Sequence, residues 1–348
     1  MTLKEIAQEA GVSISTVSRV INNKGTNAAS QEVRDRIWEI VRRTGYSPNT
    51  AARNLKTGQN SEHASPRSRS IACIFARTQE PMKDAFFSTL ARGIEQEAFK
   101  HNYVVKYIIT SLEINNPATF RLVSDNQVDG AAVLGRCDKQ MLRFLKKYFN
   151  SVVYSGLNEI QANYDQIICD GRQAAVVAVS ELQNLGHSKI AYIGETSNEI
   201  RFNGYCDAMN AKTLPVLRDY IVNTPMTSGG GYQGAKKLLN KSKDFTAVFC
   251  PNDITAIGVM KALQEHGLKI PSDVSIISID DIDLVQYITP MLTTIHVPIT
   301  EMGQVAAKIL IDRIEGGHHL PMKVNMPFYL AARESTGPSR KKHVLSQV

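Results

Sequence analysis

The sequence predicts an α/β protein with an all-α head and a two-lobed body built from doubly wound parallel sheets. Three observations support this prediction. The first 58 residues show helical periodicity broken by short turns. From residue 71 onward, short apolar runs alternate with helical stretches, which is the pattern of parallel sheets covered by helices on both faces. The body of about 260 residues that follows the head is long enough for two such lobes.

Composition narrows the class of protein. Apolar residues make up 43% and charged residues 21% of the 348 residues, a balance typical of soluble globular chains. No apolar run reaches the ~18 residues that a membrane-spanning helix needs, and the N-terminus has no apolar signal segment, so we expect a cytoplasmic protein. The cysteines are odd in number and far apart, which argues against a disulfide framework. They are Cys73, Cys137, Cys169, Cys206 and Cys250.

Positive charge concentrates at the two ends of the chain. Residues 1–70 carry 11 lysines and arginines against 6 acidic residues, and residues 333–348 carry four against one. Since the net charge of the whole chain is +7, the segment between them is close to neutral. A basic head on a nearly neutral body predicts that the head binds a polyanion, although a solvated basic face would have the same composition.

Capping residues divide the head into three helices. Thr2 and Glu5 form a capping box, which satisfies the first free backbone donors of the first helix. Gly11 ends this helix, Ser13 can cap the second helix and Ser30 the third. Apolar side chains then recur on one face of each helix. They are Leu3, Ile6, Ala7 and Ala10; Val17, Val20 and Ile21; and Val33, Ile37, Ile40 and Val41.

Two short helices joined at Gly11, with a third behind them, have the outline of a helix-turn-helix. The start of the second helix would enter the major groove of DNA. There Arg19 could donate two hydrogen bonds to a guanine, and Ile14 could contact a thymine methyl group. Short hydroxyl side chains suit phosphate contacts, and a plain three-helix bundle with Ile14 in its core is the alternative. The candidate DNA contacts of the head are Ser13, Ile14, Ser15, Thr16, Ser18 and Arg19.

The body begins after a polar linker at 59–70, and its elements alternate. Because open parallel sheets bind ligands at the carboxyl ends of their strands, two facing lobes would place a site between them. The runs that we expect to be strands are 71–76, 104–109, 130–134, 152–154, 189–194, 246–250 and 274–279. The stretches that we expect to be helices are 87–101, 141–149, 174–185, 231–239, 254–266 and 299–315.

Several motifs, in this order and spacing, resemble the lactose-repressor (LacI/GalR) family. T-L-K-E-I-A-x-x-A-G-V-S-x-S-T-V-S-R-V-I-N at 2–22 is similar to the head of that family, and so are the motifs at 30–37 and 45–55. The resemblance continues to about Arg333 through V-D-G-A-A-V-L at 128–134 and the run at 251–281. The pattern at 84–95 and the Gly-Arg pair at 135–136 look most like the galactoside-responsive branch.

The resemblance implies a homodimeric repressor of sugar-utilisation genes that binds double-stranded operator DNA and is not an enzyme. It implies a periplasmic-binding-protein-like body at 71–335, a basic tail at 336–348, and a head at 1–58 that ends in a hinge helix at 49–57. Such a short helix would form only when two copies pair over DNA. The matching positions assign DNA contacts to Asn49, Ala52 and Leu55, and Leu55 corresponds to the family's wedge between base steps.

The resemblance also implies a small sugar effector between the lobes. Arg201, in R-x-x-G-Y, matches the family's arginine for effector oxygens, and Asp280 matches its aspartate for sugar hydroxyls. Asn252 is the expected ligand group of the P-N-D motif, while Asp253 either joins it or caps the next helix.

The remaining effector candidates are less defined. Either Phe86 or Phe87 can cover the apolar face of a sugar ring, and either can instead belong to the core. Arg136 departs from the family pattern and can add a positive charge to the cleft. The linker is longer than is usual in the family, so the resemblance does not define how the hinge helix is coupled to the body.

Two other functions remain open. The run Gly229–Gly234 satisfies G-x-G-x-x-G and would suit a redox-sensing repressor that binds a nicotinamide cofactor. However, Pro225 lies where the fingerprint needs a strand, so we expect no cofactor. A catabolite regulator that depends on a protein corepressor is the second alternative. The pair His318–His319 is expected to lie in a surface turn and not at a metal.

Overall fold

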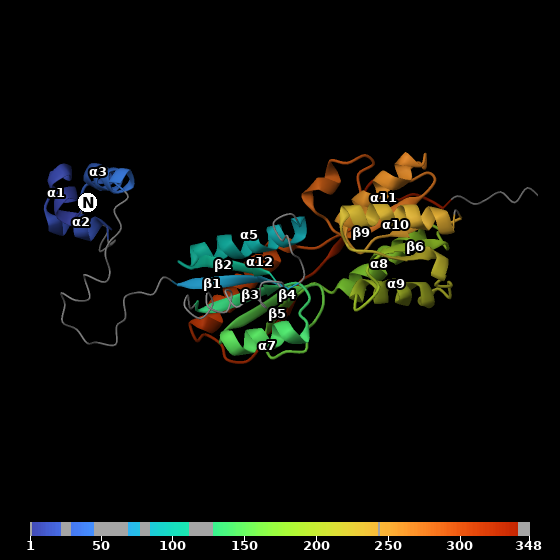
Figure 1. Cartoon of the computed structure of the whole chain (residues 1–348), viewed down its shortest axis with the longest axis horizontal. Helices are drawn as coiled ribbons and strands as arrows, with labels where there is room; N and C mark the ends of the chain where they lie inside the picture. Colours follow the sequence, from blue (N-terminus) through green and yellow to red (C-terminus); the bar gives the residue numbers. More distant parts are fainter. Residues whose placement is uncertain are drawn as a thin grey trace, which may run out of the picture. The chain divides into compact units, whose positions relative to one another are not determined.

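The computed structural model describes residues 2–21, 29–44, 69–76, 84–110, 128–242 and 244–339 (Figure 1). The chain divides into two compact units, residues 1–67 and 68–348, which we call the head and the body. Among the described residues, no helix is long and apolar enough to cross a membrane.

The head contains the three expected helices, α1 (Leu3–Ala10), α2 (Ile14–Ile21) and α3 (Gln31–Thr44). The capping box is formed, because Thr2 Oγ1 accepts from the backbone N–H of Glu5 and Glu5 Oε2 accepts from that of Thr2. Gly11 ends α1 with φ = 66°, a left-handed conformation that glycine adopts at little cost. Between the three helices lies a core of Ile6, Ala7, Ala10, Val17, Val20, Ile37 and Ile40.

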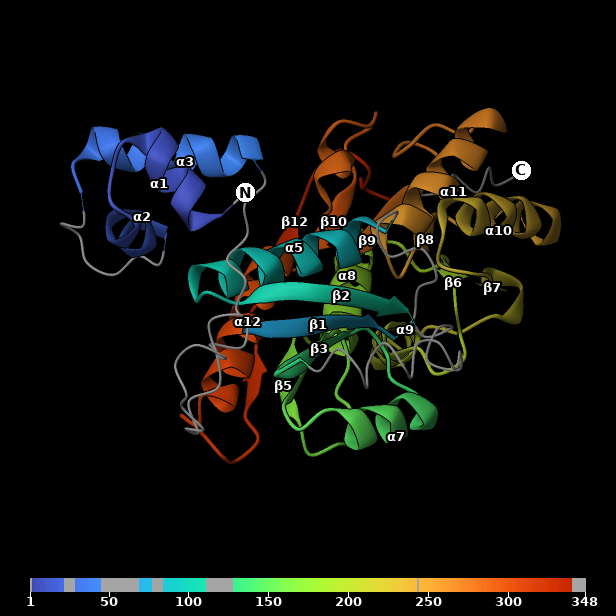
Figure 2. The same ribbon diagram turned by 60° about the vertical axis from the view of Figure 1, so that its left-hand side comes forward.

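The first lobe of the body is a six-stranded, wholly parallel sheet with the order β11-β5-β4-β3-β1-β2. Helices α5 and α12 pack against each other beside this sheet (Figure 2). The strands are β1 (Ser70–Phe75), β2 (Val104–Thr110), β3 (Gly130–Leu134), β4 (Val152–Gly156), β5 (Asp165–Ile168) and β11 (Lys323–Asn325). The helices are α5 (Ala85–Lys100), α7 (Lys139–Tyr148) and α12 (Ile299–Ile314).

The second lobe repeats this plan with the order β12-β10-β9-β8-β6-β7, in which only the pair β10–β12 is antiparallel. The strands are β6 (Ile190–Gly194), β7 (Ile221–Asn223), β8 (Ala247–Phe249), β9 (Ser275–Asp280), β10 (Thr293–His296) and β12 (Tyr329–Ala331). The helices are α8 (Gly171–Asn184), α9 (Ile200–Ala211), α10 (Ser228–Lys241) and α11 (Asp253–Glu265), with the 3-10 turns η3 (Arg218–Tyr220) and η4 (Asp283–Gln286).

Successive side chains of the central strands pack on opposite faces of the sheet, which explains why helices cover both faces. In β6, Ile190 and Tyr192 join one hydrophobic cluster with α8 and α9, while Ala191 and Ile193 join another with α10 and α11. Successive side chains of a strand point to opposite faces, so a strand that is buried on both sides must be apolar throughout. This is why these strands read as continuous apolar runs.

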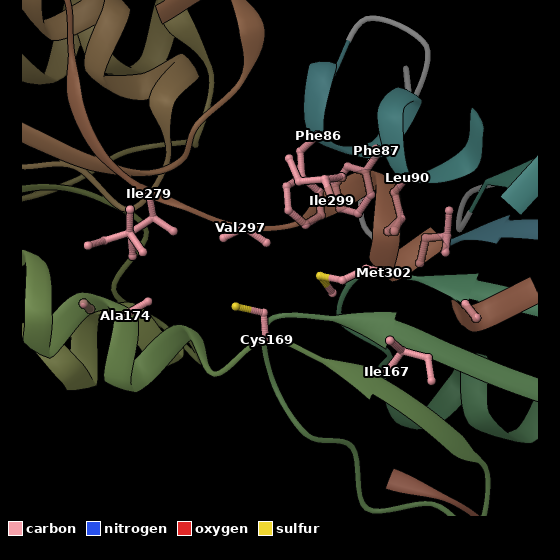
Figure 3. Packing of buried hydrophobic residues seen from close by; sticks show 14 of the residues in the cluster. Phe86, Phe87, Leu90, Ile167, Cys169, Ala174, Ile279, Val297, Ile299 and Met302 are labelled. Atoms are coloured by element: carbon pink, nitrogen blue, oxygen red, sulfur yellow. The ribbon is translucent and has the colours of Figure 1, made fainter. Parts of the chain in front are cut away.

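One hydrophobic cluster continues from lobe to lobe. The chain crosses between the lobes after β5, after β10 and after β11. Figure 3 shows Cys169 and Val297, which follow β5 and β10, lying between Met302 of the first lobe and Ile279 of the second. The crossings are therefore packed segments, and any change in lobe orientation must repack them.

The predicted α/β class with two parallel sheets is confirmed. The elements that the sequence did not predict are short or lack a clear period. Strands β5, β7, β10, β11 and β12 have only three or four residues each, too few to show a pattern. Helix α9 was also missed, because glycine, asparagine and cysteine interrupt its apolar residues.

The expected surface turn at His318–His319 is wrong for His318. Its imidazole forms hydrogen bonds with two carboxylates. Nδ1 lies 2.5 Å from Asp312 Oδ2, and Nε2 lies 3.1 Å from Asp165 Oδ2. Asp165 is fully buried at the start of β5 and also accepts from Arg313. The hydrogen bond to the Asp312 carboxylate, together with that to Asp165, raises the pKa of His318 above its usual value. No group of side chains among the described residues could hold a metal ion.

This cluster predicts a pH-dependent contribution to stability. A histidine whose pKa is raised in the folded state stabilises fully below its unfolded-state pKa of ~6.5, and that stabilisation is lost as the pH rises through the folded-state value. His318→Gln should therefore lower the Tm more at pH 6 than at pH 8.5. Thermal unfolding followed by circular dichroism measures both differences. The exposed neighbour provides the control His319→Gln, and a pH-independent difference for His318→Gln would contradict the assignment.

Candidate functional site

In the head, α2 presents a solvent-exposed face. Ile14 is 48% exposed, which excludes the alternative that places it in the core. Ser15 and Arg19 are exposed on the same side of the helix, and Ser18 is half-buried beside them. Arg19 Nε donates weakly to the Ser15 carbonyl oxygen (3.4 Å), so most of its guanidinium donors have no contact with the described residues. This face carries one apolar group, two hydroxyl groups and one arginine.

Three of the predicted hydroxyl contacts, Ser13, Ser15 and Thr16, form hydrogen bonds with one another at the start of α2. The backbone N–H of Thr16 donates to Ser13 Oγ (3.1 Å), which makes Ser13 the N-cap of α2 as predicted. The same oxygen lies 2.7 Å from Ser15 Oγ and 2.9 Å from Thr16 Oγ1. The hydroxyl groups of Ser13 and Thr16 therefore stabilise the start of α2 through hydrogen bonds within the head. The predicted contacts Asn49, Ala52 and Leu55 lie outside the described residues, as do most of the linker and the tail from residue 340 onward.

In the body, a cavity of about 550 Å³ lies between the two lobes. Its walls come from segments that follow the carboxyl ends of strands in both sheets, as parallel sheets dictate. All six predicted effector residues line it: Phe86, Phe87, Arg136, Arg201, Asn252 and Asp280. The other lining residues are Asp84, Gly135, Gly156, Leu157, Asn158, Glu195, Glu199, Ile200, Pro225, Met226 and Thr227.

Asp280 ends β9 at the floor of this cavity in a strained conformation. Its φ is 127° and that of Asp281 is 58°, values that non-glycine residues rarely adopt. The side chain is buried, and Oδ1 has no hydrogen-bond partner among the described residues. Burial, with repulsion from Asp253, raises the pKa of Asp280 well above its usual value, although Arg201 acts in the opposite direction. A buried oxygen of this kind favours a hydrogen-bond donor from a ligand.

The structure corrects the role expected for Asp253 and adds a capping role to Asn252. Asn252 is the N-cap of α11, because its Oδ1 accepts from the backbone N–H of Thr255 (3.1 Å). Asp253 is not the cap, since it begins the helix and is fully buried beneath the cavity. It accepts from Ser278 Oγ (2.6 Å), Thr294 Oγ1 (2.7 Å) and the N–H of Ile282 (2.9 Å). The side chain of Asn252 lines the cavity with its amide nitrogen unpaired among the described residues.

Arg201 is buried and held by a carboxylate close to it in the sequence. Its Nε donates to Glu199 Oε1 (2.7 Å) and its Nη2 to Glu199 Oε2 (3.1 Å), while Nη1 donates to the Pro251 carbonyl oxygen (2.8 Å). Burial would lower the pKa of Arg201, but the Glu199 carboxylate outweighs it and holds that pKa above its usual value. The guanidinium is therefore fixed and charged before any ligand enters.

Arg136 reaches from the first lobe to the second. It follows β3, and its Nη2 donates to Glu195 Oε2 (2.7 Å), a residue that follows β6. Its Nη1 donates to the carbonyl oxygens of Asn198 and Ser197. The predicted positive charge is thus present but already paired across the cleft.

Phe86 and Phe87 belong to the hydrophobic core and also reach the cavity, so their contact with a sugar ring stays a prediction. Their rings meet edge to face at 5.3 Å, and Phe87 packs in the same way on Phe75 of β1. Both belong to the main hydrophobic cluster and also line the cavity (Figure 3). The backbone N–H groups of both donate to Asp84 Oδ1, which is the N-cap of α5.

Three acidic residues of the cavity were not predicted from the sequence: Asp84, Glu195 and Glu199. Glu195 directly follows β6, so the rule that selected Asn252 and Asp280 would also have selected it. Asp84 lies three residues before the helix predicted at 87–101 and immediately before α5, where an aspartate is typical of a cap. Glu199 gave no signal of its own, because only the fold brings its carboxylate to Arg201.

The glycine run lies in a helix and not in a phosphate-binding loop. Residues 229–234 belong to α10, and β7 ends five residues before that helix begins. A Cβ atom at Gly231 would lie 2.1 Å from the Thr255 carbonyl oxygen, and one at Gly258 would lie 1.9 Å from that of Ser228. The glycines at 231 and 258 therefore allow α10 and α11 to pack closely, which accounts for them without a cofactor.

Comparisons with known proteins agree with this division of the chain. Residues 2–49 match the family "Bacterial regulatory proteins, lacI family", and residues 179–336 match a "Periplasmic binding protein-like domain". Catabolite control protein A of Priestia megaterium is 30% identical over 97% of this chain and 99% of its own. The HTH-type transcriptional repressor PurR of Aliivibrio salmonicida is 29% identical over 91% of this chain and 93% of its own.

Solved structures show the same fold. A LacI family transcriptional regulator from Enterococcus faecium with bound ribose is 31% identical, with a TM-score of 0.69 over 78% of this chain and all of its own. The lac repressor dimer bound to operator and the anti-inducer ONPF is 22% identical, with a TM-score of 0.74 over 97% of this chain and 99% of its own. The second likeness concerns the fold alone.

The helix packing predicts opposite effects for two substitutions in one glycine run. Gly231→Ala should destabilise the body by about 1–3 kcal/mol, since its Cβ would overlap the α11 backbone. Gly229→Ala should be neutral or stabilise by up to about 1 kcal/mol, because a Cβ there would meet nothing within 4 Å. Urea unfolding of the full chain measures both. Equal effects of the two variants would argue against helix packing as the reason for Gly231.

Proposed function

This chain belongs to the LacI family of bacterial regulatory proteins, and from that premise we propose that a sugar-like effector in the interlobe cavity controls its binding to operator DNA. The chain is a DNA-binding transcriptional regulator, as its relatives are. The observation that carries the effector proposal is the cavity itself, with the unpaired oxygen of Asp280 and the fixed guanidinium of Arg201 in one wall.

DNA recognition is assigned to the exposed face of α2. Arg19 extends from this face with donors available for the O6 and N7 atoms of a guanine, and Ile14 can contact a thymine methyl group. Ser15 and Ser18 lie beside them and suit phosphate or base contacts. Two heads of a homodimer would read the half-sites of a near-palindromic operator.

The hinge assignment extends this interface to residues 49–57 of the head. We assign 49–57 to a hinge helix, with Asn49, Ala52 and Leu55 as its contacts to the minor groove. Leu55 would unstack a base step, at a cost of a few kcal/mol that the additional contacts of bent DNA offset. The domain limits that go with this proposal are 1–58, 59–70, 71–335 and 336–348.

The cavity chemistry favours a polyhydroxylated ligand. Asp280 offers an acceptor oxygen, while Asn252 offers amide donors. The rings of Phe86 and Phe87 present apolar surface to the C–H groups of a sugar ring. The relative from Enterococcus faecium, at 31% identity, holds ribose, which supports a small sugar as the ligand class.

Effector and operator would act on each other through the orientation of the lobes. A ligand that touches both lobes favours one orientation, and the coupling to DNA must then be reciprocal. To shift the equilibrium from 1:99 to 99:1, the ligand must bind one state about 10⁴-fold more tightly than the other.

The recognition assignment predicts a loss of sequence discrimination. Arg19→Ala should reduce the preference for operator over scrambled DNA by about 1–3 kcal/mol, the value of a bidentate contact to guanine. Fluorescence anisotropy at constant salt measures both affinities. Arg43→Ala removes the same charge from α3, where Arg43 pairs with Glu9, and should leave discrimination unchanged. If Arg19→Ala discriminates as well as the wild type, α2 does not read bases through this residue.

The effector assignment predicts a regulator that no longer responds. Asp280→Asn keeps the size of the side chain and suits the positive φ, but it replaces one acceptor oxygen with a donor NH2 group, so effector affinity should fall by about 1–3 kcal/mol. Operator affinity without effector should persist. Calorimetry with a sugar found by screening, followed by operator titration, measures both. Asp219→Asn on the exposed η3 turn is the matched control. An unchanged sugar affinity in Asp280→Asn would remove Asp280 from the site.

A further inference from the structure

Both arginines of the cavity are part of one alternating series of charges, which we call the cleft charge chain: Glu195, Arg136, Glu199 and Arg201. Arg136 lies between two carboxylates, 2.7 Å from Glu195 Oε2 and 3.4 Å from Glu199 Oε2. Glu199 in turn holds Arg201 at 2.7 Å. All four residues line the cavity, and the two positive charges are balanced by two negative charges.

The donors that an anion needs are already occupied. Arg201 has five N–H donors, and its contacts use one at Nε, one at Nη1 and two at Nη2, the last of these a weak contact to Met226 Sδ. Both Nη groups of Arg136 are engaged, Nη2 with Glu195 and, at 3.4 Å, with Glu199, and Nη1 with the carbonyl oxygens of Ser197 and Asn198. Only Nε remains without a contact among the described residues. Neither guanidinium therefore offers the pair of parallel donors with which arginine binds a phosphate or carboxylate.

The other charged groups that line the cavity are acidic. Asp280 is buried and its Oδ1 lacks a partner among the described residues, and Asp84 lies close enough to contribute to the raised pKa of Asp280. They provide no positive charge to balance a ligand phosphate in this poorly solvated site. A hydroxyl or ammonium group would instead donate to Asp280 and relieve its unpaired oxygen.

We propose that the effector is a sugar without phosphate or carboxylate groups, and that Glu195 and Glu199 exclude anionic sugars by occupying both cleft arginines. This inference rests on the proposed function, because it concerns the ligand of the same cavity. An anionic sugar that displaced Glu199 from Arg201 would leave this buried carboxylate with only its longer contact to Arg136, at 3.4 Å.

Inorganic phosphate tests this exclusion directly, since it requires no knowledge of the sugar. Thermal unfolding of the full chain is compared in phosphate and in chloride at equal ionic strength and pH. Phosphate should have no effect on the wild type through the cavity. Glu195→Gln and Glu199→Gln each release an arginine, and each should strengthen apparent phosphate affinity at least about tenfold. Glu195 is one-third exposed, so its variant remains informative if Glu199→Gln fails to fold.

Control variants locate the effect. The double variant Glu195→Gln/Arg136→Gln should lose the gain, because the released guanidinium is gone. Glu265→Gln removes the same charge from the far end of α11 and should behave as the wild type. The proposal is overturned if phosphate stabilises the wild type in a manner that Arg136→Gln or Arg201→Gln abolishes. It is equally overturned if neither glutamine variant gains phosphate affinity.

Sugar titrations distinguish a failure of this exclusion from a failure of the proposed sugar effector. Ribose and ribose 5-phosphate are titrated into the same wild-type chain, followed by a panel of neutral hexoses and their 6-phosphates. Binding of a phosphorylated sugar in preference to its neutral parent would overturn the exclusion while leaving sugar regulation intact. Absence of any sugar binding would overturn both the exclusion and the proposed effector.

Discussion

Burial of a guanidinium at the floor of the cleft requires a counter-charge, and Glu199 supplies it to Arg201 at 2.7 Å. Removal of either partner would leave a buried charge unpaired, at a cost of roughly 3–5 kcal/mol. The pair fixes Arg201 beside Asp280, and the same glutamate lies 3.4 Å from Arg136 of the other lobe. The identity of the effector, the charge of the cavity and one interlobe contact all depend on this one interaction.

The location of several site residues could be predicted, because the carboxyl ends of parallel strands lie at a common edge of the sheet. Asn252 and Asp280 come just after β8 and at the end of β9, so their place in the cavity could be predicted from the strand pattern. The role of Asp253 was not foreseen, because it depends on where α11 begins, and a shift of one residue exchanges the cap for a buried acceptor.

The rest depends on tertiary contacts that no local pattern records. Glu199 becomes part of the site because the turn after β6 brings it under Arg201, and His318 becomes an ion-pair partner because α12 ends beside β5. Strands β5 and β11 are too short to show a period and form only by pairing with each other and with β4. The hydrophobic cluster that passes through Cys169 and Val297 likewise appears only when both lobes are assembled.

The central claim is that the interlobe cavity binds a neutral sugar, and a thermal-shift screen of the full chain tests it most directly. The panel contains neutral mono- and disaccharides, their phosphates, purines and NAD(H). A ligand at ~100 times its Kd adds about 2.7 kcal/mol of stability, which is a readable shift in Tm. The account predicts that at least one neutral sugar produces such a shift. A shift with NAD(H) alone, or with purines or sugar phosphates but no neutral sugar, would contradict it.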